Sequence, residues 1–310
     1  MNIVGKRKWY FLISALVLVP GIISLIIPPS VRAGIDFSSG SAFEVTFVQP
    51  VEEEQVRGAM ADADHPDARI QKLSASTVFI RTKELQEGER DRIQGVLEQS
   101  IAPVDFISKV ETVSPEVAGE TVRNAVIAVM VAAVGILLYI TWAFRHIPGS
   151  FRYGVAAVLA LVHDVVIIIG IFSLLGKIIG LEVNVMFVVG LLAVAGYSVN
   201  DTIVVFDRIR ENVARDIDRP LAESVNISIM ESMGRSLGTS LTTTFALLAL
   251  ILIGGATLRE FLLVLFIGTV AGTYSSIFIA SQFLVMWEMG EIGRFFRLLN
   301  PIRRLRGARA

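Results

Sequence analysis

Residues Gly190–Asn212 read GLLAVAGYSVNDTIVVFDRIREN, an apolar run that carries a carboxylate inside it. After Asp201 and one threonine come four more apolar residues, Ile203–Phe206, before charged residues begin. A helix needs about 20 apolar residues to cross a bilayer, and the run from Val183 to Phe206 is long enough. Asp201 therefore lies inside a predicted membrane span, where a carboxylate costs about 2.5 to 3.5 kcal/mol on insertion scales.

Asp201 has two interpretations. A carboxylate inside a span usually faces the interior of a helix bundle and marks an ion or proton path, so Asp201 is a candidate proton carrier. Ser198 and Tyr197 precede it by three and four residues and share its helix face. The alternative is a structural carboxylate, satisfied by a neighbouring hydroxyl or drawn to Arg208. The position inside the span favours the proton carrier.

The composition is that of an integral membrane protein. Of 310 residues, 53% are hydrophobic and 18% are charged, against about 25% charged in soluble domains. The chain has no cysteine, three histidines and no HExxH sequence. We therefore expect no disulfide and no metal site. We also expect no cofactor, no catalytic residue and no nucleic-acid partner.

Six apolar runs are long enough to cross a membrane. The first follows Lys6-Arg7-Lys8 and contains Pro20, which should kink the helix without ending it. It exceeds the core of a signal peptide, about 7–15 residues, so we expect an uncleaved span. The predicted spans are residues 9–27, 122–144, 151–175, 183–206, 236–254 and 261–287.

The basic residues alternate in step with these spans. Residues 1–8, the loop near Arg145 and Arg152, the segment 207–235 and the tail 288–310 all fall on one side. The positive-inside rule assigns that side to the cytoplasm. Both termini are then cytoplasmic, and residues 28–121 lie outside.

Residues 28–121 have the pattern of a soluble α+β domain. Phe43, Val45 and Phe47 alternate with polar residues, as in a half-buried strand. The predicted elements are a strand at 41–48, a helix at 51–63, strands at 68–73 and 77–82, a helix at 87–100 and a strand at 104–113. This β-α-β-β-α-β order predicts a ferredoxin-like domain. It carries no P-loop or nucleophile elbow, which favours a binding or mechanical role.

The segment 207–235 begins charged and then places Leu221, Val225, Ile229 and Met233 at helical spacing. Such a pattern predicts an amphipathic helix lying on the inner membrane surface.

Two further charged residues lie in or near spans. Asp164, beside His163, is in the third span and could share or relay a proton, or one or both could be packing partners of another span. Arg235 stands just before the fifth span. It could hold a carboxylate bidentately, but its position alone favours an anchor that reaches to the headgroups.

Gly268 and Gly272 form a GxxxG pair, which predicts close helix packing. We also expect a second helix bundle to cover this pair and the polar faces of the fourth and fifth spans, since six helices bury such faces poorly.

The combined pattern resembles the SecF family of bacterial protein-translocase subunits over almost the whole chain. The resemblance is carried by GIDFSSG (34–40), VHD (162–164), GRSLGTSLTTT (234–244) and above all GYSVNDTIVVFDRIREN (196–212). Asp201 occupies the position of the family's proton-coupled aspartate, and Arg235 that of the family's arginine before the fifth span. The resemblance therefore favours a functional role for Arg235 over that of a headgroup anchor. Gly34, Asp36 and Gly40 match a motif after the first span, in which Ser39 replaces a glycine.

The resemblance implies an RND-like half that pairs with SecD in a twelve-helix bundle of the bacterial inner membrane. It implies contacts with the SecYEG translocon, with YajC and with unfolded secretory polypeptides. The coupling ion would be the proton, and the complex would act as a membrane-integrated chaperone driven by the proton motive force, not as an enzyme.

Two other classes stay open. An RND-type exporter of a small molecule or lipid would use the same proton machinery but would need an enclosed ligand pocket. An intramembrane aspartyl protease would use Asp164 and Asp201 as a dyad, but its GxGD-like signature is absent.

Overall fold

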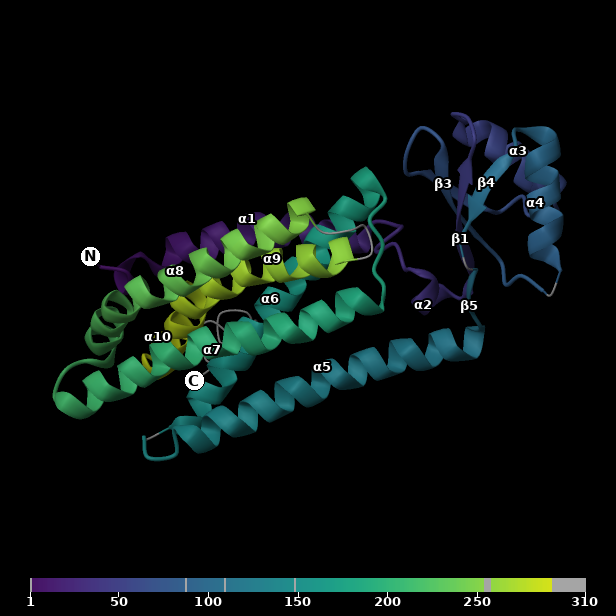
Figure 1. Ribbon diagram of the computed structural model, residues 1–310. Helices are drawn as coiled ribbons and strands as arrows, with labels where there is room; N and C mark the ends of the chain where they lie inside the picture. The colour runs from purple at the N-terminus through teal and green to yellow at the C-terminus, as the bar shows by residue number, and fades with distance from the viewer. Residues whose placement is uncertain (1, 87, 109, 148, 254–257, 292–310) are drawn as a thin grey trace, which may run out of the picture. The chain divides into compact units, whose positions relative to one another are not determined.

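The computed structural model describes residues 2–86, 88–108, 110–147, 149–253 and 258–291 (Figure 1). The chain divides into two compact units. The membrane unit comprises Met1–Arg32 and Ile127–Ala310, and the α+β unit comprises Ala33–Val126. The predicted basic tail lies outside the described residues beyond Glu291.

The described residues contain six helical segments long and apolar enough to span a membrane, as predicted. The chain is therefore a multi-pass membrane protein. The six segments are Val4–Ile26, Pro115–Ala143, Ser150–Ile179, Val185–Arg215, Leu221–Ile253 and Arg259–Glu288. Their elements are the short η1 (Val4–Lys6), α1 (Arg7–Ile26), α5 (Pro115–Ala143), α6 (Ser150–Ile179), α7 (Val185–Arg215), α8 (Leu221–Ile253), α9 (Arg259–Ser275), the π-helix η3 (Ser276–Ala280) and α10 (Ser281–Glu288).

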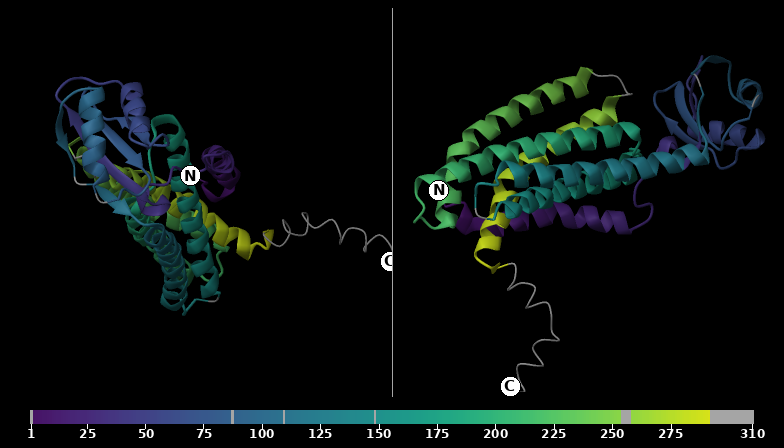
Figure 2. Two further views of the ribbon diagram at one scale, coloured as in Figure 1. Left: turned by 90° about the vertical axis from the view of Figure 1, so that its right-hand side faces the viewer. Right: turned by 90° about the horizontal axis from the view of Figure 1, so that it is seen from below.

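Local sequence signals set the ends of the central helices. Gly180 ends α6 in the left-handed conformation, with φ 76°, which glycine adopts without a steric penalty. The side chain of Asn184 accepts a hydrogen bond from the Phe187 amide at 2.9 Å and so caps α7. The last span changes direction at η3 (Figure 2), as expected where a π-turn interrupts an α-helix.

The predicted surface helix within 207–235 is wrong. Charged residues up to Arg215 extend α7, and α8 begins at Leu221 and continues through the fifth span without a break. Val225 and Ile229 are fully buried and pack in one cluster with Phe206 of α7. The apolar face of this segment therefore packs against the chain's own helices and does not lie on the lipid surface.

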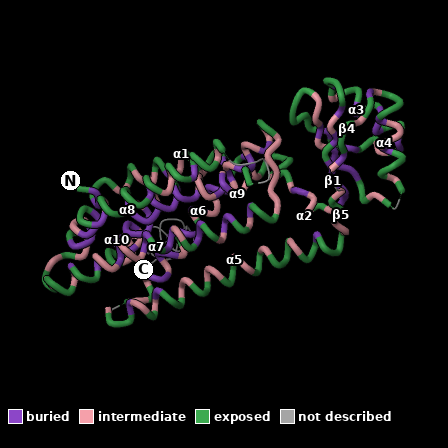
Figure 3. Tube along the Cα trace, in the orientation of Figure 1, coloured by how far each residue is buried: buried purple, intermediate pink, exposed green. Residues whose placement is uncertain are grey.

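Burial separates the helices of the membrane unit into two groups. In the most apolar 18 residues of the α6 and α7 segments, half of the residues are buried, and in those of the α9–α10 segment the share is 61%. In the corresponding 18 residues of the α5 segment, only 6% are buried. Figure 3 shows the buried positions along α6, α7 and α9, and mostly exposed ones along α1 and α5. The core of the membrane unit is thus built on α6, α7 and α9.

The GxxxG pair packs inside this core. A Cβ on Gly268 would lie 2.3 Å from Val194 Cγ2, and a Cβ on Gly272 would lie 2.8 Å from Ser198 Cβ. Helix packing by this pair is confirmed, because only glycine allows α9 to approach α7 so closely. The expectation that a second bundle covers the pair is wrong, since α7 of the same chain covers it.

The α+β unit has a small antiparallel sheet with order β2-β3-β1-β4, and β5 also pairs with β1. Helices α3 and α4 contact each other and share one core with the strands (Figure 1). Its elements are α2 (Ile35–Ser38), β1 (Gly40–Phe47), α3 (Glu53–Asp62), β2 (Arg69–Lys72), β3 (Thr77–Thr82), α4 (Glu89–Ser100), β4 (Val104–Ile107) and β5 (Glu111–Val113). The β-α-β-β-α-β order was predicted; the ferredoxin-like classification stays a prediction.

One detail of this unit differs from the sequence expectation, and another agrees with it. The single strand expected over 104–113 is two strands, because β4 pairs with the Phe47 end of β1 and β5 with its Gly40 end. The alternation of β1 is confirmed: Phe43, Val45 and Phe47 are buried, whereas Glu44 between them is exposed.

Candidate functional site

Asp201 lies on α7, inside the helix core, with only 4% of its surface exposed. Its Oδ2 accepts hydrogen bonds from Ser240 Oγ of α8 at 3.3 Å and from Thr273 Oγ1 of α9 at 3.5 Å. The two hydroxyls lie 2.5 Å apart, and the Tyr197 hydroxyl donates to Ser240 at 3.3 Å. Asp201 is therefore held by neutral hydroxyls that come from two other helices.

Asp164, on α6, is fully buried and has a separate set of partners. Its Oδ2 accepts from Ser198 Oγ at 2.6 Å and from Ser275 Oγ at 2.8 Å. Its Oδ1 lies 3.0 Å from Nδ1 of His163, whose Nε2 lies 2.5 Å from Ser14 Oγ of α1. Asp164 of α6 is thus contacted from α7 and α9, and α1 is joined to it through His163.

A second row of hydroxyls joins α7 to the π-helix. Thr202 Oγ1 lies 2.8 Å from Ser276 Oγ, which donates to the Ser198 carbonyl at 3.0 Å. The π-helix starts at Ser276, and the adjacent Ser275 and Ser276 are both fully buried. Single π-turns are frequent at functional sites. Around this turn, Ser275 contacts Asp164 and Ser276 contacts the backbone of α7.

The structure does not bring Arg235 to Asp201. Arg235 is exposed, and among the described residues no ion pair joins it to Asp201. It lines a cavity of about 360 Å³ beside α7 and α8. The other lining residues are Val204, Asp207, Arg208, Glu211, Glu231 and Ser232. In this cavity Arg208 pairs with Glu231 at 2.7 Å and with Glu211 at 2.5 Å.

The motif after the first span lies in the α+β unit. Gly34 precedes α2, and Asp36 sits half-buried in its first turn. Arg81 of β3 holds the motif, since its guanidinium donates to the Ala33 carbonyl at 2.8 Å and also to Ser38 Oγ.

The end of the motif needs unusual backbone conformations. Gly40 has φ 118°, and a Cβ there would lie 2.4 Å from the Thr82 carbonyl oxygen. Ser39 has φ 59° and ψ 170°, a region that is almost restricted to glycine. Ser39 therefore adopts a backbone conformation that glycine would adopt without strain.

Several residues of the two carboxylate sites were not predicted. Ser14, Ser240, Thr273 and Ser275 carry no distinctive local pattern that marks them as partners of a carboxylate. One signal was present in the sequence: serines recur every four residues on α8, at 224, 228, 232, 236 and 240. All five are buried.

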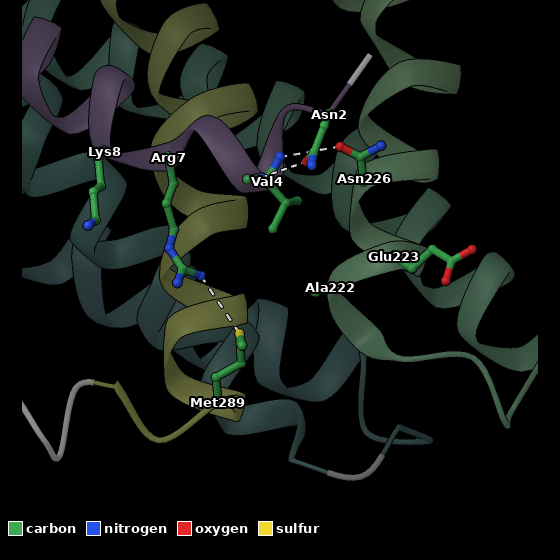
Figure 4. Close-up of a pocket in the computed structure, with 9 residues that line it drawn as sticks. Asn2, Val4, Arg7, Lys8, Ala222, Glu223, Asn226 and Met289 are labelled. Atoms are coloured by element: carbon green, nitrogen blue, oxygen red, sulfur yellow. Dashed lines mark hydrogen bonds between the residues drawn. The ribbon is translucent and has the colours of Figure 1, made fainter.

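A second cavity, of about 520 Å³, lies where the N-terminus meets α8 and α10 (Figure 4). Asn226 of α8 accepts hydrogen bonds from the amides of Ile3 at 2.7 Å and Val4 at 3.2 Å. Arg7 points to Met289 (Figure 4) and pairs with Glu291 at 2.5 Å. The Asn226 hydrogen bonds thus join the segment before α1 to α8, and the Arg7 contacts join the start of α1 to the residues after α10.

The described residues contain no group of three or more His, Asp and Glu side chains that could hold a metal ion. The two carboxylate sites are thus hydrogen-bonded polar centres within a helix bundle. The fold and these centres define a multi-pass α-helical membrane protein with an α+β unit inserted after its first span.

Comparison with known proteins gives the family. The family model described as "Protein export membrane protein SecD/SecF, C-terminal" matches residues 96–290. The chain belongs to the SecD/SecF family of protein export membrane proteins.

Full-length relatives carry the name protein translocase subunit SecF. The protein from Thermobaculum terrenum is 40% identical over 97% of this chain and 98% of its own length. The protein from Anaerolinea thermophila is 38% identical over 96% of this chain and 97% of its own length.

Solved structures agree with this assignment. The crystal structure of SecDF from Thermus thermophilus matches with a TM-score of 0.80 and 35% identity, over 93% of this chain and 38% of the longer SecDF chain. A second crystal structure, of SecDF in a super-membrane-facing form, matches with a TM-score of 0.64 and 33% identity, over 96% of this chain and 40% of that one.

Proposed function

We propose that this chain is a SecF-type accessory subunit of bacterial protein export, and that proton exchange at Asp201 drives it. The family membership supports the export role. The observation that carries the proton step is the burial of Asp201 among Ser240 and Thr273 hydroxyls from two neighbouring helices.

The choice of hydroxyl partners suits a group that changes its protonation state. A hydroxyl donates to a carboxylate and also accepts from a carboxylic acid. Ser240 and Thr273 can therefore satisfy Asp201 in both forms by rotating their O–H bonds. A guanidinium only donates, so it would favour the ionised form alone.

Protonation of Asp201 would change the hydrogen bonds that join α7 to α8 and α9. One charge that moves through 100 mV releases about 2.3 kcal/mol, enough to shift an equilibrium between two helix arrangements substantially.

We propose that Asp164 acts as a second carboxylate of the same proton path. We place Arg235 at the charged cavity, where it could meet Asp201 only after α7 and α8 move.

SecD is the proposed partner. Some relatives join SecD and SecF in one SecDF chain, of which this chain matches about two fifths. On α5, large apolar residues such as Met130, Val131, Leu138 and Trp142 are more than half exposed. A second helix bundle would cover such a surface. Contacts with SecYEG, with YajC and with unfolded secretory polypeptides stay predictions, as does the role of Gly34, Asp36 and Gly40.

We propose that both termini face the cytoplasm of a bacterium and that the α+β unit lies outside the inner membrane. Single cysteines at Glu89 and Arg215 test this orientation. A reagent that does not cross the membrane should label the cysteine at 89 from outside and leave the one at 215 unlabelled. Labelling of position 89 only from the cytoplasmic side would overturn the orientation.

The proton step is tested with Asp201→Asn, which keeps the volume and the hydrogen bonding but cannot release a proton. We expect normal folding and normal association with SecD, together with loss of the stimulation of export by an imposed pH gradient. Arg235→Lys keeps the charge but loses the planar fork, and we expect partial stimulation. Export is measured in inverted vesicles with and without the gradient. If Asp201→Asn still responds fully, Asp201 is structural and the mechanism is wrong.

The aspartyl-protease alternative needs its two carboxylates to share a proton. Among the described residues no hydrogen bond joins Asp164 to Asp201, and each has its own donors. The geometry therefore favours a transport role over a protease dyad.

A further inference from the structure

The five serines at 224, 228, 232, 236 and 240 form a stripe along α8. This serine stripe leads to Asp201 from the cavity that Arg208 and Arg235 line, which we call the charged cavity. Ser232 lines the cavity, and Ser240 donates to Asp201. Ser236 lies between them, four residues from each, on the same helix face. The stripe therefore connects the surface cavity to the buried carboxylate.

The α7–α8 seam keeps this stripe against α7 along its length. Asn212 of α7 donates to Ser228 Oγ at 2.9 Å, and Ser240 meets Asp201 about three helix turns further along. In this antiparallel register Ser236 comes opposite Val204 and Val205, of which Val205 is fully buried. Ser236 thus faces the seam and not the surroundings of the bundle.

Ser236 is distinguished by a hydroxyl without a partner. The residue is 1% exposed, and its Oγ makes no hydrogen bond within the part of the chain that the structure describes. Ser228 and Ser232, by contrast, donate to the carbonyls of Ser224 and Ser228. A buried hydroxyl without a partner is unfavourable and is commonly satisfied by an internal water.

We propose that Ser232, Ser236 and Ser240 form the path by which water and a proton reach Asp201 from the charged cavity. Successive hydroxyls are about 6 Å apart along the helix, and one water with two hydrogen bonds spans about that distance. The charged groups that line the cavity are Asp207, Arg208, Glu211, Glu231 and Arg235. These charged groups keep the mouth of the cavity hydrated. The proposal rests on proton exchange at Asp201.

The chain supplies a matched control. Ser224 belongs to the same stripe, is fully buried, and its Oγ also lacks a partner within the described residues. It lies beyond the cavity, on the side away from Asp201. Ser236→Ala and Ser224→Ala each remove one unpaired buried hydroxyl without adding volume, so both variants should fold as stably as the natural protein.

The experiment measures proton uptake with a trapped pH-sensitive dye. The chain and its variants are reconstituted with SecD in vesicles, and a pH gradient is imposed. We expect Ser236→Ala to slow gradient-driven uptake by about 2- to 12-fold, the factor that the net contribution of one hydrogen bond gives when it is lost at a barrier. Ser224→Ala should match the natural protein, and both variants should show unchanged thermal unfolding.

Equal rates of proton uptake for Ser236→Ala and Ser224→Ala would overturn the proposed path. The serines would then serve only the close packing of α8 against α7. Asp201→Asn in the same vesicles separates this result from failure of the proposed function. If Asp201→Asn loses gradient-driven uptake while Ser236→Ala keeps it, only the path is wrong. If Asp201→Asn keeps it, proton exchange at Asp201 is wrong as well.

Discussion

Replacement of Gly272 by alanine tests the contact that holds the two carboxylate sites together. The added Cβ would lie 2.8 Å from Ser198 Cβ and 3.3 Å from Ser198 Cα, both close to the α7 backbone. Ordinary contact begins at 3.4 Å, so α7 and α9 would have to separate by about 0.6 Å, which close-packed cores resist.

Two free-energy terms decide the magnitude for Gly272→Ala. Overpacking a well-packed core costs about 1–3 kcal/mol. Alanine in place of glycine within a helix contributes about 1 kcal/mol in the opposite direction. The net change in the free energy of unfolding should therefore lie between about zero and a loss of 2 kcal/mol.

Gly196→Ala is the matched control. Gly196 lies on α7, two residues before Ser198, and no described atom lies within 4 Å of a Cβ built there. This variant gains the helix propensity without the clash. The two variants should differ by about 1–3 kcal/mol, with Gly272→Ala the less stable.

The assay is unfolding of the purified chain in detergent micelles, followed by circular dichroism. The displacement should also weaken the 2.6 Å bond from Ser198 to Asp164. A shift of 0.6 Å along this bond would lengthen it to about 3.2 Å, outside the usual range for O–H···O bonds. Equal stabilities for Gly272→Ala and Gly196→Ala would refute the close approach of α9 to α7.

Three further predictions concern other parts of the chain. Ser39→Gly should stabilise the α+β unit by about 1 kcal/mol, because it removes backbone strain, whereas Ser39→Ala should not; thermal unfolding distinguishes them. Asn226→Ala should leave the amides of Ile3 and Val4 unpaired and lower stability by about 1–3 kcal/mol, while Asn226→Asp, which keeps an acceptor, should lower it less. Ser14→Ala should remove the hydrogen bond of α1 to the His163 ring and loosen α1, seen as faster hydrogen exchange near position 14; unchanged exchange would contradict this contact.

The sequence by itself determined the presence of six spans, the order of the α+β elements and the position of Asp201 inside a span. These follow from local properties: the length of an apolar run, its period, and the cost of a charge in hydrocarbon. The family resemblance also rested on contiguous residues, mainly 196–212, and the comparisons confirmed it.

Only the tertiary structure decided which groups meet these residues. Arg235 looked like the counter-ion of Asp201 along the chain, yet hydroxyls of Ser240 and Thr273 occupy that place. The apolar face around Val225 looked like a membrane-surface helix, yet it packs against α7. The reason is physical: periodicity reports that a helix face is apolar or polar, but its partner depends on how helices far apart in the sequence pack together.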